Sequence, residues 1–221
     1  MESLKLLFLL GVCLSLLDTA ISDPIPQNET IYANETVYKP PDEGCGRKGG
    51  KNDFQVCIME HFLPENVTRG MYNESRCPTC AHICSKSESI LNCAYSAIDE
   101  RAQCNQYVRD VGERFFRGIF AATVAFFCEG GGDRLTTIDD SQNMRCIVTQ
   151  ESNCTISLIP DDRSDSRTLE FTPEALCRNF ISGLSCVAKK AEACNQETAA
   201  LFLQYADYLK TNSPCSSPAG S

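Results

Sequence analysis

Apolar residues recur at helical spacing in two parts of the chain, and each part predicts a pair of helices. In the first part, Ser85-x-x-Glu88 has the form of a capping box that opens one helix, and Asn105 offers an N-cap to the next. The longest apolar run, Ile119 to Phe127, is expected to be a buried helix segment. The apolar positions at roughly helical spacing are Ile90, Leu91, Ile98, Val108, Val111, Phe115, Ile119 and Phe126.

The second part has clearer helix boundaries. Thr172 is a suitable N-cap, Pro173 stands at the first helical position, and Phe171 is placed to staple against Leu176. Asn195 is the expected N-cap of the last helix, in which three apolar residues follow four apart: Leu201, Tyr205 and Leu209. The pattern therefore predicts a mostly-α fold of helical hairpins.

Cysteine spacing divides the chain into two similar units. Cys84, Cys93, Cys104 and Cys128 are separated by 8, 10 and 23 residues, and Cys177, Cys186, Cys194 and Cys215 by 8, 7 and 20. The residues around these cysteines also match between the units, since LNCA at 91–94 corresponds to LSCV at 184–187 and Cys-Asn-Gln occurs at both 104–106 and 194–196. We predict a duplicated unit, with copies at 84–128 and 177–215 and a linking insert at 129–176.

Helix geometry restricts the disulfides of the second unit. Cys177 and Cys186 are nine residues apart, which places them on opposite sides of one straight helix. One is expected to close its own hairpin and the other to tie the hairpin to a different segment. Cys186 to Cys194, across a short turn, is the favoured local closure, and the remaining pairings stay open.

The linking insert is expected to be irregular or to contain a short hairpin. Gly130 to Arg134 (GGGDR) permits a sharp chain reversal after a long helix. A glycine-rich loop of this kind could suggest phosphate binding, but it lacks the Lys-Ser/Thr ending of a P-loop and follows a helix, so a structural turn is favoured. Residues 146–159 contain enough Ile, Val and Thr for a short β-hairpin.

The N-terminus predicts secretion. Met1 to Ser22 contains Lys5, an apolar run too short to span a bilayer and the small residues Ala20 and Ser22, as in a cleaved signal peptide. Residues 23–44 are rich in proline and poor in aliphatic residues, which predicts a flexible arm, and residues 45–221 form the expected single cysteine-rich domain. Five sequons predict N-glycosylation at Asn28, Asn34, Asn66, Asn73 and Asn153.

Composition agrees with an oxidising compartment. The chain has 15 Cys, of which Cys13 falls in the signal peptide, so an even number remains for disulfides. A formal net charge of -9 without a basic block argues against nucleic acid as a partner, and no apolar run in the mature chain reaches membrane length. The predicted disulfide cysteines are Cys45, Cys57, Cys77, Cys80, Cys84, Cys93, Cys104, Cys128, Cys146, Cys154, Cys177, Cys186, Cys194 and Cys215.

One cluster carries possible chemistry. Cys77-Pro78-Thr79-Cys80 has the spacing of a redox motif, although two structural cystines sharing a loop explain it equally well and are favoured because a sequon, not an apolar strand, precedes it. Cys77, Cys80, His82 and Cys84 also have the residue types of zinc ligands, but they are not two separated pairs. With only two His, neither in a hydrolase setting, we expect no catalytic residue, metal site or cofactor.

The cysteine spacing also carries a family resemblance. The run from Cys84 to Cys128, preceded by Phe127 and followed by Gly132-Asp133-Arg134 and by Cys146, resembles the insect haemolymph glycoproteins named for their 27 kDa size. The resemblance covers residues 84–215 and implies a secreted helical protein of body fluid without established catalytic activity. This chain departs from it in the polar residues 135–145 and in four cysteines with no counterpart: Cys45, Cys57, Cys77 and Cys80.

Three functions are compatible with these features. The first is a secreted, non-enzymatic glycoprotein of extracellular fluid that binds a macromolecular partner, an unknown extracellular protein. The second is a carrier of a small apolar ligand, suggested by a surplus of phenylalanine at Phe115, Phe116, Phe120, Phe126 and Phe127. The third is a thiol–disulfide enzyme that uses Cys77 and Cys80.

Overall fold

The structure is a computed structural model, and the part of the chain that it describes is helical. The described residues are 54, 56–58, 60–61, 77–104, 108–109, 113–139, 146, 154 and 173–216. Nearly all of them are helical and no strand occurs among them, which confirms the predicted mostly-α fold class. The expected signal peptide, the arm at 23–44 and the five sequons lie outside these residues.

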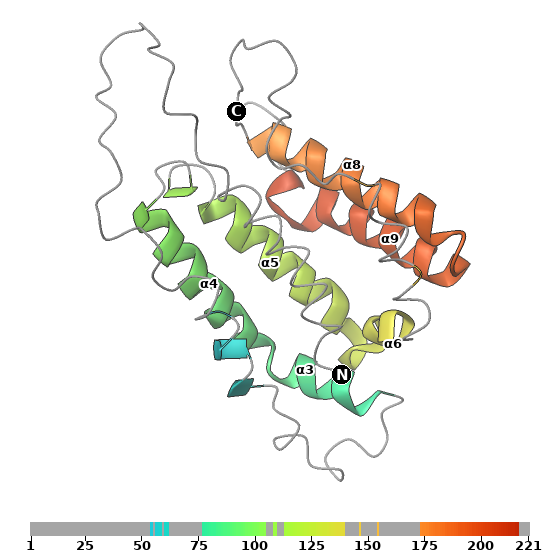
Figure 1. Cartoon of the computed structure of the whole chain (residues 1–221), viewed down its shortest axis with the longest axis horizontal. Helices are drawn as coiled ribbons and strands as arrows, with labels where there is room; N and C mark the ends of the chain where they lie inside the picture. The colour runs from blue at the N-terminus through green and yellow to red at the C-terminus, as the bar shows by residue number, and fades with distance from the viewer. Residues whose placement is uncertain are drawn as a thin grey trace, which may run out of the picture.

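Two side-by-side helix pairs form the body of the molecule (Figure 1). α4 packs along α5, α8 packs along α9, and α5 also contacts α9, so α5 lies between α4 and the second pair. α3 and α6 lie close together at one end of α5. The elements are α3 (Pro78–Ser85), α4 (Ser87–Cys104), α5 (Glu113–Cys128), η4 (Glu129–Gly131), α6 (Asp133–Asp139), α8 (Pro173–Ala191), α9 (Gln196–Asn212) and η5 (Pro214–Ser216).

A helix that the sequence pattern did not predict, α3, precedes α4, the helix that it did predict. α3 starts at Pro78, so Ser85 is the last residue of a helix and not the N-cap of one, and the predicted capping box is wrong. The Ser85 hydroxyl donates a hydrogen bond to the His82 carbonyl at 2.6 Å. Lys86 alone separates the two helices, and α4 begins at Ser87.

The long apolar run lies in α5, as predicted. Ile119, Phe120, Phe126 and Phe127 are buried in this helix. The preceding Val108 is also buried and is π-helical, whereas Asn105 and Val111 lie outside the described residues. α5 begins at Glu113.

The helix starts predicted for the second pair agree with the structure. α8 begins at Pro173, although Thr172 and Phe171 are outside the described residues. The Asn195 side chain accepts a hydrogen bond from the Thr198 backbone N–H at 3.0 Å, which confirms it as the N-cap of α9. The three apolar positions that follow four apart are all buried: Leu201, Tyr205 and Leu209.

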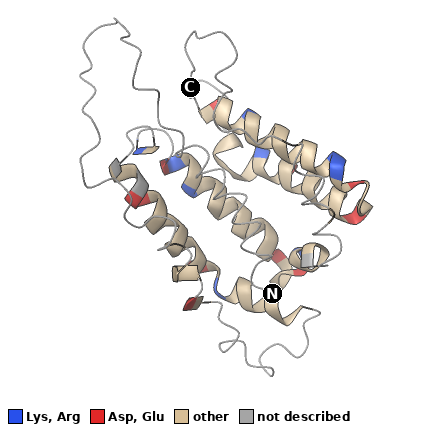
Figure 2. Cartoon of the chain, viewed as in Figure 1, with Lys and Arg blue, Asp and Glu red and all other residues tan. Residues whose placement is uncertain are grey.

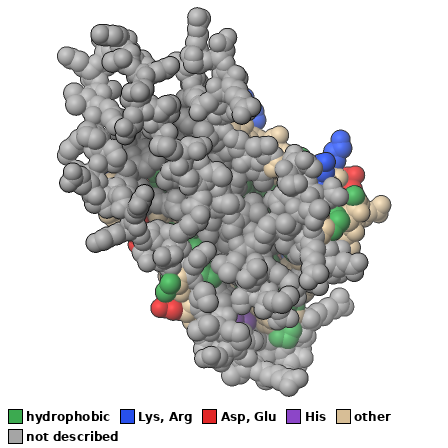
Figure 3. Space-filling view, in the orientation of Figure 1, with side chains coloured by type: hydrophobic (Ala, Val, Ile, Leu, Met, Phe, Trp, Pro, Cys, Tyr) green, Lys and Arg blue, Asp and Glu red, His purple; other side chains and the backbone are tan. Residues whose placement is uncertain are grey.

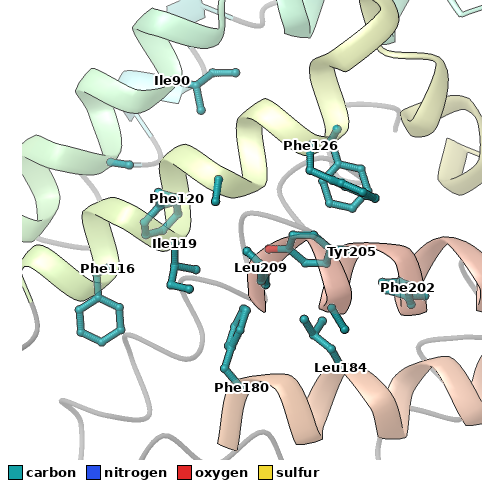
Figure 4. Close-up of a cluster of buried hydrophobic side chains, with 14 of the residues drawn as sticks. Ile90, Phe116, Ile119, Phe120, Phe126, Phe180, Leu184, Phe202, Tyr205 and Leu209 are labelled. Carbon is teal, nitrogen blue, oxygen red and sulfur yellow. The ribbon is translucent and has the colours of Figure 1, made fainter. Parts of the chain in front are cut away.

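The core is formed where α5 meets α8 and α9 (Figure 4). The Tyr205 ring stacks on Phe126, with ring centroids 5.2 Å apart, and its hydroxyl lies 2.5 Å from the Thr123 hydroxyl. At the end of the chain Pro214 approaches α5 so closely that a Cβ on Gly118 would overlap its ring. The absence of a side chain at Gly118 thus permits η5 to lie against α5.

The glycine-rich segment is a turn, as predicted. Gly130, Gly131 and Gly132 all have positive φ, at 71°, 77° and 93°, which only glycine adopts without strain. The turn leads directly into α6, a short helix that the sequence pattern did not predict and that buries Leu135 and Ile138. Of residues 146–159, the structure describes Cys146, which is helical, and Cys154; the rest of the expected hairpin lies outside the described residues.

Charged side chains lie on the outer surfaces of the helices. Arg117 forms ion pairs with Asp99 of α4 and Glu113 of α5, and so joins these two helices. Basic and acidic residues lie close together where α8 passes into α9 (Figures 2 and 3). Among the described helices, none is both long and apolar enough to cross a membrane.

Candidate functional site

Six disulfides join the described cysteines. Cys45 lies outside the described residues, and the side chain of Cys104 is not described although the residue belongs to α4. The six pairs are Cys57–Cys93, Cys77–Cys80, Cys84–Cys128, Cys146–Cys194, Cys154–Cys186 and Cys177–Cys215.

The disulfides follow the same order in the two predicted units. Cys84–Cys128 and Cys177–Cys215 each join the first and fourth cysteines of a unit. Cys57–Cys93 and Cys154–Cys186 each join the second cysteine to a residue that precedes the unit. The Cys77–Cys80 disulfide has no equivalent, because no Cys occurs between Cys154 and Cys177.

The prediction that Cys186 bonds to Cys194 is wrong. α8 continues to Ala191, so Cys186 lies inside the helix, more than a turn before its end, and bonds to Cys154 of the insert. Cys194 likewise bonds to Cys146. The expectation that Cys177 and Cys186 serve different purposes is confirmed, since Cys177 closes the α8–α9 hairpin and Cys186 ties it to the insert.

The Cys77–Cys80 disulfide sits in the first turn of α3. Cys77 is the N-cap, Pro78 follows it, and the Cys80 backbone N–H donates to the Cys77 Sγ at 3.1 Å. The favoured prediction of two separate cystines is therefore wrong, because one helical turn brings residues i and i+3 to the same face. Both cysteines are buried, with 7% of Cys77 and 4% of Cys80 exposed.

Ring size distinguishes this disulfide from the other five. In the loop-entropy model a bridge that closes four residues stabilises a fold by about 2 kcal/mol, whereas closing roughly 30 to 50 residues contributes about 4 kcal/mol. The sequence separation of Cys77 and Cys80 is 3, and the other described pairs are separated by 32 to 48 residues. Cys77–Cys80 is thus the described bridge that contributes least to holding the scaffold together.

The cysteines considered as zinc ligands are engaged in disulfides. Because a metal binds the thiolate, the oxidised sulfurs of Cys77, Cys80 and Cys84 are unavailable to it. His82 is buried, and its Nε2 lies 3.2 Å from the His61 carbonyl oxygen, to which a protonated Nε2 donates. This side chain therefore ties α3 to the preceding helical segment.

A second group of possible ligands was not recognised in the sequence. The ligand atoms of Cys57, His61 and Cys93 lie within 4.8 Å of one another, and the four-residue spacing of Cys57 and His61 on a helix was the available signal. Cys57 and Cys93 are bonded to each other, so this group acts as a covalent tie between the N-terminal segment and α4.

Gly132 brings the glycine-rich turn against α3. A Cβ at this position would lie 3.1 Å from the Cys80 carbonyl oxygen and 3.2 Å from the Cys84 Sγ. Two residues later, the Arg134 guanidinium donates to the Phe126 carbonyl at 2.6 Å, lies 4.1 Å from the centre of the Phe126 ring and pairs with Glu129. The Gly-Asp-Arg motif is therefore a structural cap on the end of α5.

The phenylalanines considered for a ligand pocket belong to the core. Phe126 and Phe127 contact each other and the Tyr205 ring, and Phe115 packs edge-on against Phe116. Phe120 is 1% exposed. Packing between helices therefore accounts for the surplus of phenylalanine that suggested a carrier.

Comparison with known proteins identifies the family but no function. No curated protein and no solved structure matches this chain. One family model, described as "Protein of unknown function (DUF1397)", matches residues 47–215. This range contains all six described disulfides and the Gly-Asp-Arg motif, and it begins well before Cys84, where the resemblance to haemolymph glycoproteins starts. The chain therefore belongs to the DUF1397 family.

Proposed function

We propose that this chain is a secreted, N-glycosylated protein of extracellular fluid that acts by binding a macromolecular partner and not by catalysis. The observation that carries the proposal is the disulfide framework. Five bridges with separations of 32 to 48 residues join the described helices to each other and to the segments between them. Such frameworks are typical of oxidising extracellular compartments.

A cross-linked scaffold favours binding because the surface is ordered before the partner arrives. Less conformational entropy is then lost on association, so more of the contact energy appears as affinity. The resemblance to insect haemolymph glycoproteins supports haemolymph or a secretion as the fluid. The described phenylalanine side chains are buried in the core, which leaves the outer helix faces and the predicted glycosylated segments for recognition.

Secretion is tested by expressing the full chain in insect cells. We expect the protein in the medium to begin at Asp23 and to lose mass when treated with an N-glycosidase, because residues 1–22 have the form of a cleaved signal and five sequons follow. N-terminal sequencing and intact-mass measurement provide the readout. Retention of the full-length, unglycosylated chain inside the cell contradicts the proposal.

Binding is tested with the secreted, glycosylated chain immobilised and exposed to native extracellular fluid. The expected result is a protein or polysaccharide recovered in constant proportion to the chain. The matched control is the same protein after reduction and alkylation, which has lost the framework and is expected to recover none. Recovery of a stoichiometric lipid instead favours the carrier. If the immobilised chain recovers neither a macromolecule nor a lipid from the fluid, both the macromolecular binding function and the carrier function are contradicted.

A further inference from the structure

The Cys77–Cys80 disulfide differs from every other described bridge in three respects. It closes the smallest ring, it has no equivalent in the second unit, and it lies at the beginning of a helix. The other five described disulfides cross-link residues 57–128 among themselves and residues 146–215 among themselves without it. A bridge with little part in holding the fold together is one that can open without unfolding the protein.

The surroundings of Cys77 favour its reduced form. Cys77 occupies the N-cap of α3, where the helix dipole presents partial positive charge, and its Sγ already accepts a hydrogen bond from the Cys80 N–H. Both effects stabilise a thiolate at Cys77, as in other cysteines at helix N-termini. A pair whose reduced form is stabilised in this way is more readily reduced than an ordinary structural disulfide.

Burial limits which reductants reach the pair. Only 7% of Cys77 and 4% of Cys80 is exposed. Sulfurs so enclosed exclude a protein thiol more strongly than a small, flexible one, and the residue that follows Cys77, Pro78, is exposed. Cys77 lies at the end of the helix, next to the exposed Pro78, and we expect its Sγ to be the sulfur that is attacked.

We propose that Cys77–Cys80 is a redox switch that exchanges two electrons with low-molecular-mass thiols. A thiolate attacks the Cys77 Sγ, the bond to the Cys80 Sγ breaks, and Cys80 leaves as a thiolate. A second thiolate attacks the small-molecule sulfur of the mixed disulfide and releases Cys77 as a thiolate. Two small thiols thus become one small disulfide, and their two protons and two electrons convert the Cys77–Cys80 cystine into two thiols.

Opening of the Cys77–Cys80 disulfide is expected to change the conformation of the glycine-rich turn. The Cys80 carbonyl is in close contact with Gly132, so a change in the first turn of α3 bears directly on the chain that links α5 to α6. The switch is independent of the proposed binding function, and either can fail without the other.

The primary test uses the unaltered, secreted full chain. The protein is incubated with increasing concentrations of reduced glutathione, alkylated with a mass tag and mapped by peptide mass spectrometry. Cys77 and Cys80 are expected to be tagged first, at a rate at least about tenfold above that of the other cysteines. Tagging of another pair at the same or a lower glutathione concentration overturns the proposal, as does simultaneous opening of all bridges.

Two single variants test whether the position of Cys77 makes its sulfur unusually reactive. In Cys80→Ser, the Cys77 thiolate is expected to form a mixed disulfide with oxidised glutathione that Cys80 can no longer resolve. The matched control is Cys57→Ser, which frees buried Cys93 in α4, and its reaction is expected to be about tenfold slower because Cys93 lacks the helix N-terminus. Equal rates in the two variants overturn the assignment of Cys77.

A double variant tests whether the scaffold needs the bridge. Cys77→Ser/Cys80→Ser is expected to be secreted at a level close to that of the unaltered chain and to keep its other disulfides. A double variant that is retained in the cell or secreted with scrambled disulfides overturns the proposal, because the bridge would then be a structural staple. The glutathione measurement on the unaltered chain does not depend on this outcome.

Discussion

Arg134 explains why glycine, aspartate and arginine occur together after α5. Its guanidinium satisfies the Phe126 carbonyl near the C-terminus of the helix, where backbone acceptors lack partners. The same group lies over the Phe126 ring, 4.1 Å from its centre, and pairs with Glu129. The positive charge also complements the negative end of the helix dipole. One side chain therefore fixes the direction in which the chain leaves α5.

Substitution Arg134→Ala is predicted to lower the free energy of unfolding by about 2 kcal/mol, through loss of a charge-assisted hydrogen bond and a cation–π contact. Glu129→Gln is the matched control. Glu129 is 65% exposed, so its ion pair is screened by solvent and its loss is expected to change stability by less than about 0.5 kcal/mol. Urea denaturation with the disulfides intact measures both, and equal losses contradict the cap.

The Tyr205 hydroxyl forms a polar contact inside the core. It meets Thr123, whose hydroxyl also donates to the Ile119 carbonyl at 2.7 Å. Tyr205→Phe is predicted to lower the free energy of unfolding by about 1 kcal/mol, because one buried hydrogen bond is lost while the ring keeps its packing. In a double-mutant cycle with Thr123→Val, a coupling energy near zero contradicts a direct interaction.

At the scale of elements, the turn between α5 and α6 depends on which glycine is replaced. Gly131 and Gly132 both have positive φ, but only a Cβ on Gly132 would press against the backbone of α3. Gly131→Ala is predicted to reduce stability by about 1 kcal/mol from the backbone conformation alone, and Gly132→Ala by at least about 2 kcal/mol. Thermal unfolding of the two variants compares them, and equal shifts show that the contact with α3 is unimportant.

Helix starts were predictable where the signal is local. Pro173 and the Asn195 cap act within one turn of their own helices, and the structure has both. α3 was missed because Cys77-Pro78 resembles a loop, although the sulfur of Cys77 takes the place of a capping oxygen. α6 was missed because its only signal is Leu135 and Ile138, three residues apart in a polar stretch.

The candidate site was less predictable, because disulfide pairing is a property of tertiary contacts. Cys177 and Cys186 could be assigned to different partners since a single helix fixes their directions. Their partners could not be assigned, because Cys154 and Cys215 come into reach only after α8 and α9 have packed. Cys77–Cys80 was misassigned for the opposite reason: the pairing is local, but it requires a helix that was not predicted.

At the scale of the molecule, the two kinds of disulfide have different consequences. Cys177–Cys215 closes 39 residues from the start of α8 to η5, whereas Cys77–Cys80 closes one helical turn. Cys177→Ala/Cys215→Ala is predicted to lower the free energy of unfolding by about 4 kcal/mol, and Cys77→Ala/Cys80→Ala by about 2 kcal/mol. Guanidinium denaturation of the two variants ranks them, and the reverse order contradicts the loop-entropy argument.

None of the six described disulfides links residues 57–128 to residues 146–215. During synthesis the first set can therefore oxidise completely while the second is still being translated, which limits the number of wrong pairings available at any moment. In the folded protein, the described contacts between the halves are non-covalent, and they include those of Phe126 and Phe127 with Tyr205. A protease that cuts between Asp139 and Cys146 would convert one chain into two polypeptides that are held together, among the described contacts, by packing and hydrogen bonds such as that between Thr123 and Tyr205.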